Sequence, residues 1–358
     1  MCVARWRIKL KVYINLQIII NNIKRVRART RAGVKLLFMV KADAYGHGLC
    51  EVALATESFV DGFGVATLEE GLALRSCGIK KPILLLVCCV DELKDAIDGG
   101  LTICLSNEAQ LSELERLISS GLSADDVKLH IALDSGMHRL GFEQLDGVLK
   151  RLSAAGIDLE GAYSHLRVRS RAQIAAFERM CKKVRETYPD ITRHLAASRS
   201  LECKSLQYDM VRVGISAYLG AMSVESEVVA SRRVAAGEYV SYGNFKVKRD
   251  TNVAVVFGGY ADGVARERPS AVYIHGRECK PLGRVCMDMT VVDCGDFLPN
   301  IGEKAVLLDG ENINDVAKQR GSIEYTLMTC WRGRTERIYY DESGGEADGE
   351  TSRRRDER

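Results

Sequence analysis

The sequence lacks an excess of charge of either sign and lacks a long apolar run. Its 358 residues contain 51 Lys and Arg against 48 Asp and Glu, which gives a formal net charge of +3. That balance gives no electrostatic reason to expect nucleic acid or a membrane surface as a partner. No stretch approaches the ~20 consecutive apolar residues of a membrane span, and residues 1–10 show no apolar segment with a cleavage site behind it. We therefore expect a cytoplasmic protein without nucleic-acid or membrane partners.

The sequence also lacks the cysteine and histidine spacings that are typical of metal sites. None of the 12 cysteines stands in a Cys-x-x-Cys pair, and the 6 histidines do not cluster with cysteines or acids at ligand spacing. We therefore expect no metal. Cys88, Cys89 and Cys104 lie in apolar runs, where a reduced thiol packs as a small hydrophobe. We expect reduced cysteines, as in most cytoplasmic proteins.

Residues 1–222 alternate between short apolar runs and segments of helical character. The expected strands are Leu36–Lys41, Gly62–Ala66, Pro82–Val87, Leu101–Leu105, Val127–Leu133, Leu159–His165, His194–Ala197 and Met210–Ile215. Helical periodicity marks the segments Leu68–Cys77, Asn107–Ser120, Glu143–Ala155 and Arg171–Tyr188. Continuously apolar strands suit a parallel sheet that is buried on both faces. Eight of them with helices between is the count of a (β/α)8 TIM barrel, although a doubly wound sheet alternates in the same way.

After residue 222 the long helical patterns end. Short strands are expected at Asn252–Phe257, Ala271–Ile274, Thr290–Asp293 and Lys304–Leu308, separated by glycine-containing turns. The predicted fold is thus α/β, with an N-terminal TIM barrel in residues 1–222 and a C-terminal mostly-β domain in residues 223–340. Residues 1–20 are assigned either to the barrel or to packing with the β domain, and residues 341–358 to a disordered tail.

The most informative segment is residues 40–48, with the sequence VKADAYGHG. The apolar run before it carries Lys41 to the C-terminal end of the first expected strand, which is the end where barrels hold their catalytic groups. Burial there should lower the pKa of Lys41 and favour the neutral amine that attacks carbonyl groups. The residues alone leave two readings open, a Schiff-base lysine or a lysine that extends from a strand end into solvent.

Further motifs follow in a fixed order along the chain. They are DSGMHRLGF at 134–142, YSH at 163–165, HLAAS at 194–198, VRVGI at 211–215, VSYG at 240–243, GYADG at 259–263 and CMD at 286–288. Together with the Lys41 segment, this series resembles the alanine racemase family over roughly residues 8–340. Members of that family depend on pyridoxal 5′-phosphate.

The resemblance implies a homodimeric isomerase that interconverts L- and D-alanine by a two-base mechanism on a pyridoxal-phosphate aldimine. Lys41 would hold the cofactor and act as one base, and Tyr242 would be the other, reaching across the dimer interface. Two bases on opposite faces suit proton removal on one side and delivery on the other. His165 and Arg212 would supply the positive charge that lowers the pKa of Tyr242. Arg212 would also face the pyridine nitrogen of the cofactor.

The resemblance also assigns binding residues. The cofactor phosphate would be held by Tyr45, the Ser198 hydroxyl and the backbone N–H groups around Gly214 and Ile215. Substrate binding would involve Arg139, Tyr260, Met287 and Asp288.

Four departures from the family pattern stand out. Ala197 replaces a usual asparagine, Ala132 a frequently carbamylated lysine, and Gly333 a tyrosine that narrows the entrance. The connection from Arg212 to Tyr242 is also short. These losses suggest a wider entrance and a broader substrate range that includes serine or basic amino acids.

The leading functional prediction is an alanine racemase that supplies D-alanine for cell-wall peptide. A related pyridoxal-phosphate decarboxylase for basic amino acids shares the two-domain plan, but the Arg212 and Tyr242 motifs fit it less well. A non-catalytic, single-barrel pyridoxal-phosphate protein is the third reading, and the long β-rich second domain argues against it.

Overall fold

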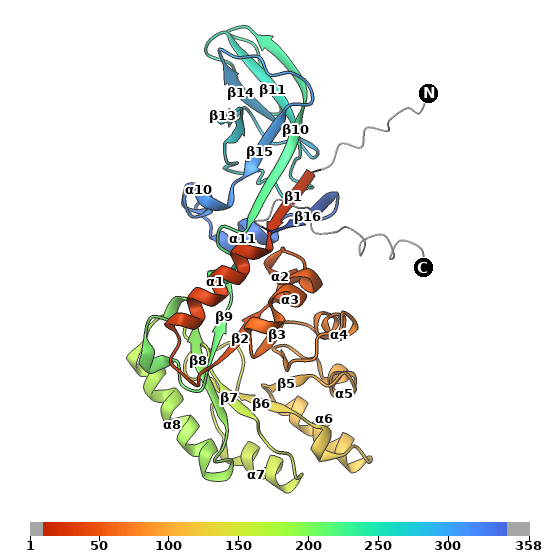
Figure 1. Cartoon of the computed structure of the whole chain (residues 1–358), viewed down its shortest axis with the longest axis vertical. Coiled ribbons are helices and arrows are strands. Elements are labelled where there is room, and N and C mark those ends of the chain that lie inside the picture. The colour runs from red at the N-terminus through yellow and green to blue at the C-terminus, as the bar shows by residue number, and fades with distance from the viewer. Residues whose placement is uncertain (1–9, 342–358) are drawn as a thin grey trace. The chain divides into compact units, whose positions relative to one another are not determined.

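The computed structural model describes residues 10–341, which divide into two compact units (Figure 1). The barrel unit comprises Ile20–Ala44 and Gly48–Ala217. The β unit comprises residues 10–19, 45–47 and 218–341. The division falls between residues 217 and 218, slightly before the boundary expected at residue 222. The tail expected at 341–358 lies, apart from residue 341, outside the described residues.

Eight parallel strands close into a barrel in the order of the sequence. They are β2 (Lys35–Met39), β3 (Gly62–Val65), β4 (Ile83–Leu85), β5 (Thr102–Leu105), β6 (Leu129–Ala132), β7 (Gly161–Tyr163), β8 (Thr192–Ala197) and β9 (Met210–Val213). Six of them, β3 to β7 and β9, are buried along their whole length, because side chains of a closed barrel face either its interior or the surrounding helices. All eight expected strands are found, and the predicted TIM barrel is confirmed.

Helices surround the barrel strands in Figure 1, and α4 (Leu68–Ser76), α6 (Glu108–Ser119) and α8 (Arg171–Thr187) begin at side-chain caps. Thr67, Asn107 and Ser170 each accept a hydrogen bond from a backbone N–H of the first turn that follows. The other helical segments are α1 (Leu16–Arg29), α2 (Lys41–Tyr45), α3 (Leu49–Thr56), α5 (Leu93–Asp98), α7 (Asp146–Ala154) and α9 (Ile215–Tyr218).

The β unit is built on an eight-stranded sheet in the order β11-β14-β13-β12-β15-β10-β1-β16. The bounds of its elements are β1 (Leu10–Asn15), β10 (Met222–Val234), β11 (Thr251–Phe257), β12 (Val272–Ile274), β13 (Arg277–Pro281), β14 (Met289–Gly295), β15 (Lys304–Leu308), α10 (Ile313–Arg320), α11 (Glu324–Thr329) and β16 (Thr335–Tyr340). The predicted mostly-β domain is confirmed. The strands β1, β10, β13 and β16 and the helices α10 and α11 were not expected from the sequence. Strand β1 pairs with β10 and with β16, so the first strand of the chain completes the sheet of the C-terminal unit.

One pair of cysteines departs from the expectation of reduced thiols. Cys50 and Cys77 form a disulfide whose Cα atoms lie 6.0 Å apart, within the usual range for such a bridge. The free cysteines within residues 10–341 are Cys88, Cys89, Cys104, Cys181, Cys203, Cys279, Cys286, Cys294 and Cys330.

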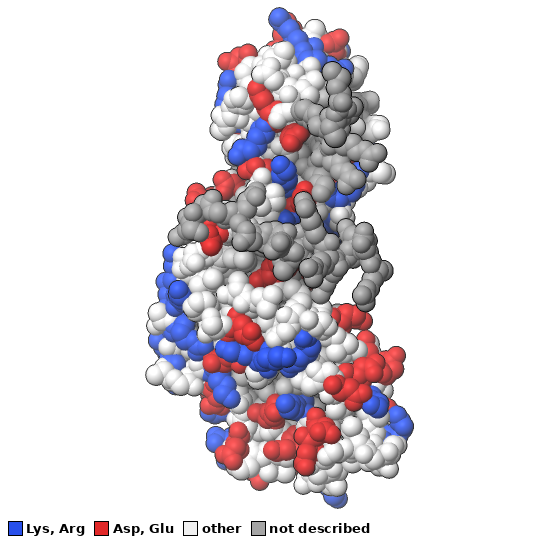
Figure 2. Space-filling view, turned by 45° about the vertical axis from the view of Figure 1, so that its right-hand side comes forward, with Lys and Arg blue, Asp and Glu red and all other residues white. Residues whose placement is uncertain are grey.

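Two surface properties match the charge and hydropathy of the sequence. No helix in the described residues is long and apolar enough to cross a membrane. Acidic and basic side chains are interspersed over the face shown in Figure 2.

Candidate active site

Lys41 opens a left-handed turn at the C-terminal end of β2. Ala42, Asp43 and Ala44 have φ values of 54, 56 and 52°. This conformation costs L-amino acids about 1–2 kcal/mol per residue, so it persists only where other contacts hold it. Glu70 supplies one such contact, because one of its carboxylate oxygens accepts the N–H of Ala42 at 2.6 Å and the other accepts the N–H of Ala66 at 2.8 Å.

The surroundings of Lys41 lower the pKa of its amine. Burial is the largest cause, and the positive charges of Arg139 and Arg212 act in the same direction, whereas Glu70 opposes them. The predicted direction of the shift is therefore confirmed. A lowered pKa increases the fraction of neutral amine at neutral pH, and the neutral amine is the nucleophilic form.

Arg212 extends from β9 into the barrel interior, where it is 5% exposed. Its Nη1 contacts the Nδ1 and the carbonyl oxygen of His194, both at 2.9 Å. Its Nη2 donates to the carbonyl oxygens of Ser164 at 2.7 Å and Leu195 at 3.2 Å. Burial lowers the pKa of Arg212 to about 10, so the guanidinium stays protonated at neutral pH. These contacts use the four N–H groups of the two terminal nitrogens and leave the Nε–H of the five available donors.

The contacts of Arg212 fix the tautomers of two buried histidines. Because arginine only donates, Nδ1 of His194 must accept, and its proton therefore lies on Nε2. That nitrogen is 2.8 Å from Nδ1 of His130, which accepts in turn and leaves the proton of His130 on Nε2. Burial lowers the pKa of His130 to about 3 and that of His194 well below its usual range. Both rings are therefore neutral. His194 contacts Arg212, and His130 in turn contacts His194.

His165 follows the end of β7 and is neutral as well. Burial and then the charges of Arg212, Arg139 and Lys41 lower its pKa to about 4. In the single chain His165 therefore adds no positive charge, and its expected part in lowering the pKa of Tyr242 stays a prediction. The cationic group of this pair is Arg212 alone.

Ser198 lies directly after β8, facing the segment that follows β9. Its Oγ accepts the N–H of Gly214 at 3.0 Å and lies 3.1 Å from the Oγ of Ser216. Hydroxyl and backbone N–H donors thus converge where these two neighbouring strands end. Such a set of neutral donors can hold a phosphate, and Ile215 lies within the same short segment.

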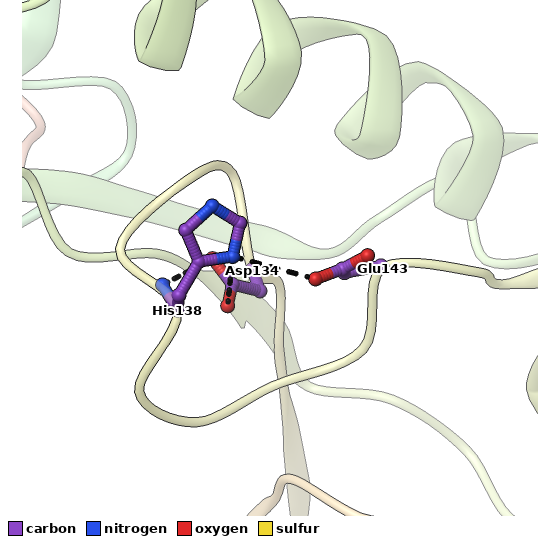
Figure 3. A group of neighbouring side chains, drawn as sticks. All are labelled: Asp134, His138 and Glu143. Carbon is purple, nitrogen blue, oxygen red and sulfur yellow. Dashed lines mark hydrogen bonds and ion pairs between the residues drawn. The ribbon is translucent and has the colours of Figure 1, made fainter.

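Arg139 lies in the loop after β6, and Asp134 holds that loop in shape. One Asp134 oxygen accepts the N–H groups of Gly136, Met137 and His138 at 2.8–3.1 Å. The exposed ring of His138 lies 3.7 Å from the other Asp134 oxygen and 3.4 Å from Glu143, as Figure 3 shows.

Asp134, His138 and Glu143 could in principle offer one ligand atom each to a metal ion. Three backbone amides occupy Oδ1 of Asp134, while its Oδ2 faces the His138 ring, so the interactions of Asp134 stabilise the loop. In the described part of the chain no acidic side chain forms an ion pair with Arg139. Ala132, at the position of the usual carbamylated lysine, is buried and offers only a methyl group.

Tyr242 belongs to the β unit and projects from a tight turn. Ser241 before it and Gly243 after it have φ values of 57 and 91°. The carbonyl oxygen of Tyr242 accepts the N–H of Arg284 at 3.1 Å, and the Ser241 hydroxyl donates to the Arg284 carbonyl at 2.8 Å. The Tyr242 side chain is 67% exposed in the single chain.

The β unit brings Tyr260, Met287 and Asp288 together. Tyr260 N–H donates to the carbonyl of Cys286, and the Asp288 carbonyl accepts the N–H of Gly258. A side chain at Gly259 would lie 2.3 Å from the Cys286 and Met287 carbonyl oxygens, so only glycine permits this close approach.

Arg334 fastens the same loop cluster from the C-terminal strand. It forms a bidentate pair with the fully buried Asp262 at 2.9 Å and contacts Asp288 at 2.8 Å. Gly333 beside it has φ 71°, and a Cβ there would meet no atom within 4 Å. The position that often carries a tyrosine in the family is thus open space within this unit.

Tyr45 is buried in an aromatic cluster of the β unit. Its ring stacks on Tyr218 with centroids 4.8 Å apart and lies 5.7 Å from Tyr325. Burial raises the pKa of its hydroxyl, which therefore remains a neutral hydrogen-bond donor.

The structure thus gathers Lys41, Arg139, His165 and Arg212 by their mutual electrostatic influence, and Ser198 with Gly214 by a hydrogen bond. The sequence analysis missed the roles of Glu70, His194, Ser216 and Arg334. His194 and Ser216 stand in or beside quoted motifs, so their position was a usable signal. Glu70 and Arg334 carried no such signal, because their partners lie far away in the sequence.

Comparison with known proteins places both halves of the chain. Residues 14–221 match the family model for the alanine racemase N-terminal domain, and residues 221–339 match that for the C-terminal domain. An alanine racemase of Streptococcus pyogenes is 33% identical over 358 aligned residues, which cover 91% of this chain and 97% of that protein.

Solved structures agree. The chain is similar to the alanine racemase of Acinetobacter baumannii, with 29% identity, a TM-score of 0.82 and coverage of 93% of this chain and 100% of that one. It is also similar to the Bacillus anthracis enzyme solved with bound L-Ala-P, with 26% identity, a TM-score of 0.87 and coverage of 96% and 98%.

Proposed function

Because the chain belongs to the alanine racemase family, it is an isomerase that interconverts L- and D-alanine, and we propose that Lys41 and Tyr242 are its two bases. Its product D-alanine serves cell-wall peptide synthesis, which is the role of the family. We propose that the enzyme acts in the cytoplasm. The observation that carries the assignment is the amine of Lys41, whose pKa is lowered at the C-terminal edge of a closed barrel beside Arg139 and Arg212. The match to a separate C-terminal domain argues against the single-barrel alternative.

The residues of the barrel unit fit pyridoxal 5′-phosphate. Gly214 and Ser216 offer uncharged donors within hydrogen-bond distance of the Ser198 hydroxyl, and the three groups could turn together to a phosphate. Lys41 offers an amine for a carbonyl. When bound, the cofactor supplies an electrophilic carbonyl and an electron sink for charge at the α-carbon. Tyr45 and the Ile215 N–H remain proposed phosphate ligands on the family resemblance.

Arg212 presents a donor to the cofactor ring. Its terminal nitrogens are occupied by His194, Ser164 and Leu195, so the Nε–H is the donor left for a ligand. Since the pKa of Arg212 is about 10, this group donates and does not give up its proton at neutral pH. The neutral His165 in the same site can accept a hydrogen bond at one ring nitrogen and donate one from the other without adding charge.

We propose that Lys41 holds or delivers the α-proton on one face and Tyr242 on the other. Tyr242 would act in the barrel of a second copy of this chain, in a homodimer. Its 67% exposure supports this, as does the exposure of Met287 and Tyr260, at 53 and 38%, in the neighbouring loops. Arg139, with Met287, Asp288 and Tyr260, would bind the substrate and line its entrance.

Reductive trapping tests the assignment of Lys41. Treating the purified enzyme with borohydride and digesting it should yield one peptide that carries reduced cofactor on Lys41. The variant Lys41→Ala should give no such peptide, whereas a control variant, Lys35→Ala at the opposite end of β2, should give it unchanged. A label on another lysine would overturn the account.

Isotope exchange tests Tyr242. In deuterium oxide, Tyr242→Phe should slow α-proton exchange from one alanine enantiomer far more than from the other, because each base serves one face. Tyr239 is the matched control, since it is 66% exposed in the same segment. Tyr239→Phe should exchange both enantiomers at wild-type rates. Equal slowing of both enantiomers in Tyr242→Phe would contradict the two-base assignment.

Mixing two inactive variants tests the shared site. A dimer of a Lys41→Ala chain with a Tyr242→Phe chain contains one intact site if Tyr242 acts across the interface. Random re-association should then restore roughly a quarter of the wild-type activity. No restoration, with mixed dimers shown to form, would mean that Tyr242 acts within its own chain.

The substrate range follows from the open position at Gly333. We propose that the enzyme accepts serine or lysine in addition to alanine. Racemisation rates for the three amino acids test this, and strict alanine preference would refute it.

A further inference from the structure

The Cys50–Cys77 disulfide lies beside the segment that carries Lys41. Cys50 is the second residue of α3, which is separated by three residues from the end of the Lys41 turn at Tyr45, and Cys77 caps the C-terminal end of α4. The bridge therefore joins α3, which follows that turn, to α4.

The entrance of the same turn is tied to the same helix. Glu70, in the first turn of α4, accepts the N–H of Ala42 at 2.6 Å. Within the turn, a carboxylate oxygen of Asp43 accepts the N–H of Leu49 at 2.8 Å and so couples the left-handed residues to the start of α3. Helix α4 is thus joined to the entrance of the Lys41 turn by a hydrogen bond and to α3, which follows the turn, by a covalent bond.

A backbone that is left-handed at Ala42, Asp43 and Ala44 depends on such restraints, because the conformation is disfavoured for residues with a side chain. The disulfide is the covalent one among several restraints, which include the backbone bonds from Ala44 N–H to the Val40 carbonyl and from Gly48 N–H to the Asp43 carbonyl. Opening it should let the segment sample other conformations more often. We propose that Cys50 and Cys77 form a reversible thiol–disulfide clamp that fixes the Lys41 turn when oxidised and loosens it when reduced. Its effect on catalysis rests on the proposed role of Lys41.

Position distinguishes this pair from most of the other cysteines. Cys50 and Cys77 are half-buried residues. Cys88, Cys104 and Cys181 are buried free thiols, and burial raises the pKa of each. They are therefore poor nucleophiles for exchange.

The chemistry needs a low-molecular-weight disulfide of the glutathione class as oxidant. The thiolate of one cysteine attacks that disulfide and releases one small thiol, which leaves a mixed disulfide on the protein. The second cysteine, as its thiolate, attacks the protein sulfur of the mixed disulfide and releases the second small thiol. Two protein thiols are thus oxidised to one bridge while one small disulfide is reduced to two thiols, and the reverse sequence opens the clamp.

The experiment equilibrates the holoenzyme in buffers of varied oxidised-to-reduced glutathione ratio. Alkylation with mass spectrometry measures the Cys50–Cys77 bridge, hydrogen exchange measures the amides of residues 42–50, and a racemisation assay measures activity. We expect the bridge to titrate within the range of the buffers. Oxidation should slow exchange in residues 42–50 by about tenfold and should change activity with the same midpoint.

Two variants serve as controls. In Cys50→Ser/Cys77→Ser the exchange of residues 42–50 should match that of the reduced wild type at every glutathione ratio. Cys279 and Cys294 also face each other, on β13 and β14, and they can still be oxidised in this variant. The variant therefore shows whether that pair causes the change in hydrogen exchange of residues 42–50. Cys89→Ser, which removes an exposed free thiol of the barrel unit, should behave like the wild type.

The outcomes separate the clamp from the proposed function. A bridge that never titrates, or one that titrates without changing exchange in residues 42–50, overturns the clamp. Redox-dependent exchange in a protein that racemises no alanine in either state upholds the clamp and refutes the proposed function. Redox-dependent exchange with unchanged activity limits the clamp to the backbone and overturns its catalytic consequence.

Discussion

Gly161 at the start of β7 offers a sharp test of the buried histidine chain. A Cβ at this position would lie 2.7 Å from two ring atoms of His130 and 2.7 Å from the carbonyl oxygen of Thr192. Unstrained contacts between such atoms lie near ~3.5–4.0 Å. The ring cannot retreat freely, because it is 6% exposed and its Nδ1 is bonded to His194. Alanine at position 161 must therefore displace the His130 ring or separate β7 from β8.

The cost of Gly161→Ala can be worked from these contacts. Overpacking a filled interior costs about 1–3 kcal/mol, and the lost His130–His194 hydrogen bond adds about 1 kcal/mol. Lower entropy of the unfolded chain returns about 0.4–1 kcal/mol. The net loss of barrel stability should therefore be about 1–3.5 kcal/mol. Racemisation should also slow, because His194 orients Arg212.

Native-state hydrogen exchange of the amides in β7 and β8 measures this loss in the barrel unit alone. Gly147 is the matched control, because it lies in α7 and a Cβ there meets no atom within 4 Å. Gly147→Ala should leave the barrel unchanged or stabilise it by about 0.5–1 kcal/mol.

A second background isolates the contact with the ring. In His130→Ala the imidazole is gone, so Gly161→Ala should cost at least about 1 kcal/mol less there than in the wild type. The reasoning is refuted if Gly161→Ala is as stable as the wild type. It is equally refuted if the substitution costs the same in both backgrounds.

Three further predictions concern the pKa of Lys41, the phosphate site at Ser198 and the two buried histidines. Replacing Glu70 with Gln removes the negative charge that opposes the lowering of the pKa of Lys41, so that pKa should fall further. The pH profile of Lys41 acylation in cofactor-free protein should then move to lower pH, and a move to higher pH contradicts this. Ser198→Ala should weaken binding of pyridoxal 5′-phosphate about tenfold, because one polar partner of the phosphate is lost; an absorbance titration with unchanged affinity would exclude that role. The folded pKa of His130 is about 3 and that of His194 is well below its usual range, whereas both titrate near ~6.5 in the unfolded chain. Below pH ~6.5 the unfolded chain binds protons that the folded chain does not, so His130 lowers the free energy of unfolding by about 1.4 kcal/mol per pH unit down to roughly pH 3, and His194 acts in the same direction. Above pH ~6.5 neither histidine lowers the free energy of unfolding. Urea midpoints that stay constant from pH 6.5 to 4.5 would contradict this effect of the histidines.

The barrel was predictable because each of its strands can be recognised from a few consecutive residues. Each expected strand is a short apolar run bounded by turn residues. A strand that is buried on both faces is apolar throughout, so such a run is enough to predict it. The strands of the β unit are harder to find. In β10 inward residues such as Met222 and Val224 alternate with outward Ser223 and Glu225, and the inward set includes Ser226, which interrupts the apolar pattern. Strand β1 is short and apolar, but its partners β10 and β16 lie more than 200 residues away in sequence.

The site divides in the same way. The motifs that contain Lys41, Arg212 and Tyr242 are local strings, so a family resemblance finds them. Glu70 and Arg334 act on residues far from them in sequence, and only folding brings those partners together.

The sequence alone determined the α/β plan, the family resemblance and the direction of the shift in the pKa of Lys41. These follow from composition, periodicity and residue identity, which a linear string contains. The tertiary structure decided that His165 is neutral, that Arg212 keeps one donor for a ligand, and that Cys50 and Cys77 are joined. A protonation state depends on burial and on every charge nearby, and a disulfide depends on two sulfurs meeting. Both are properties of distances in space, which the order of residues along the chain does not contain.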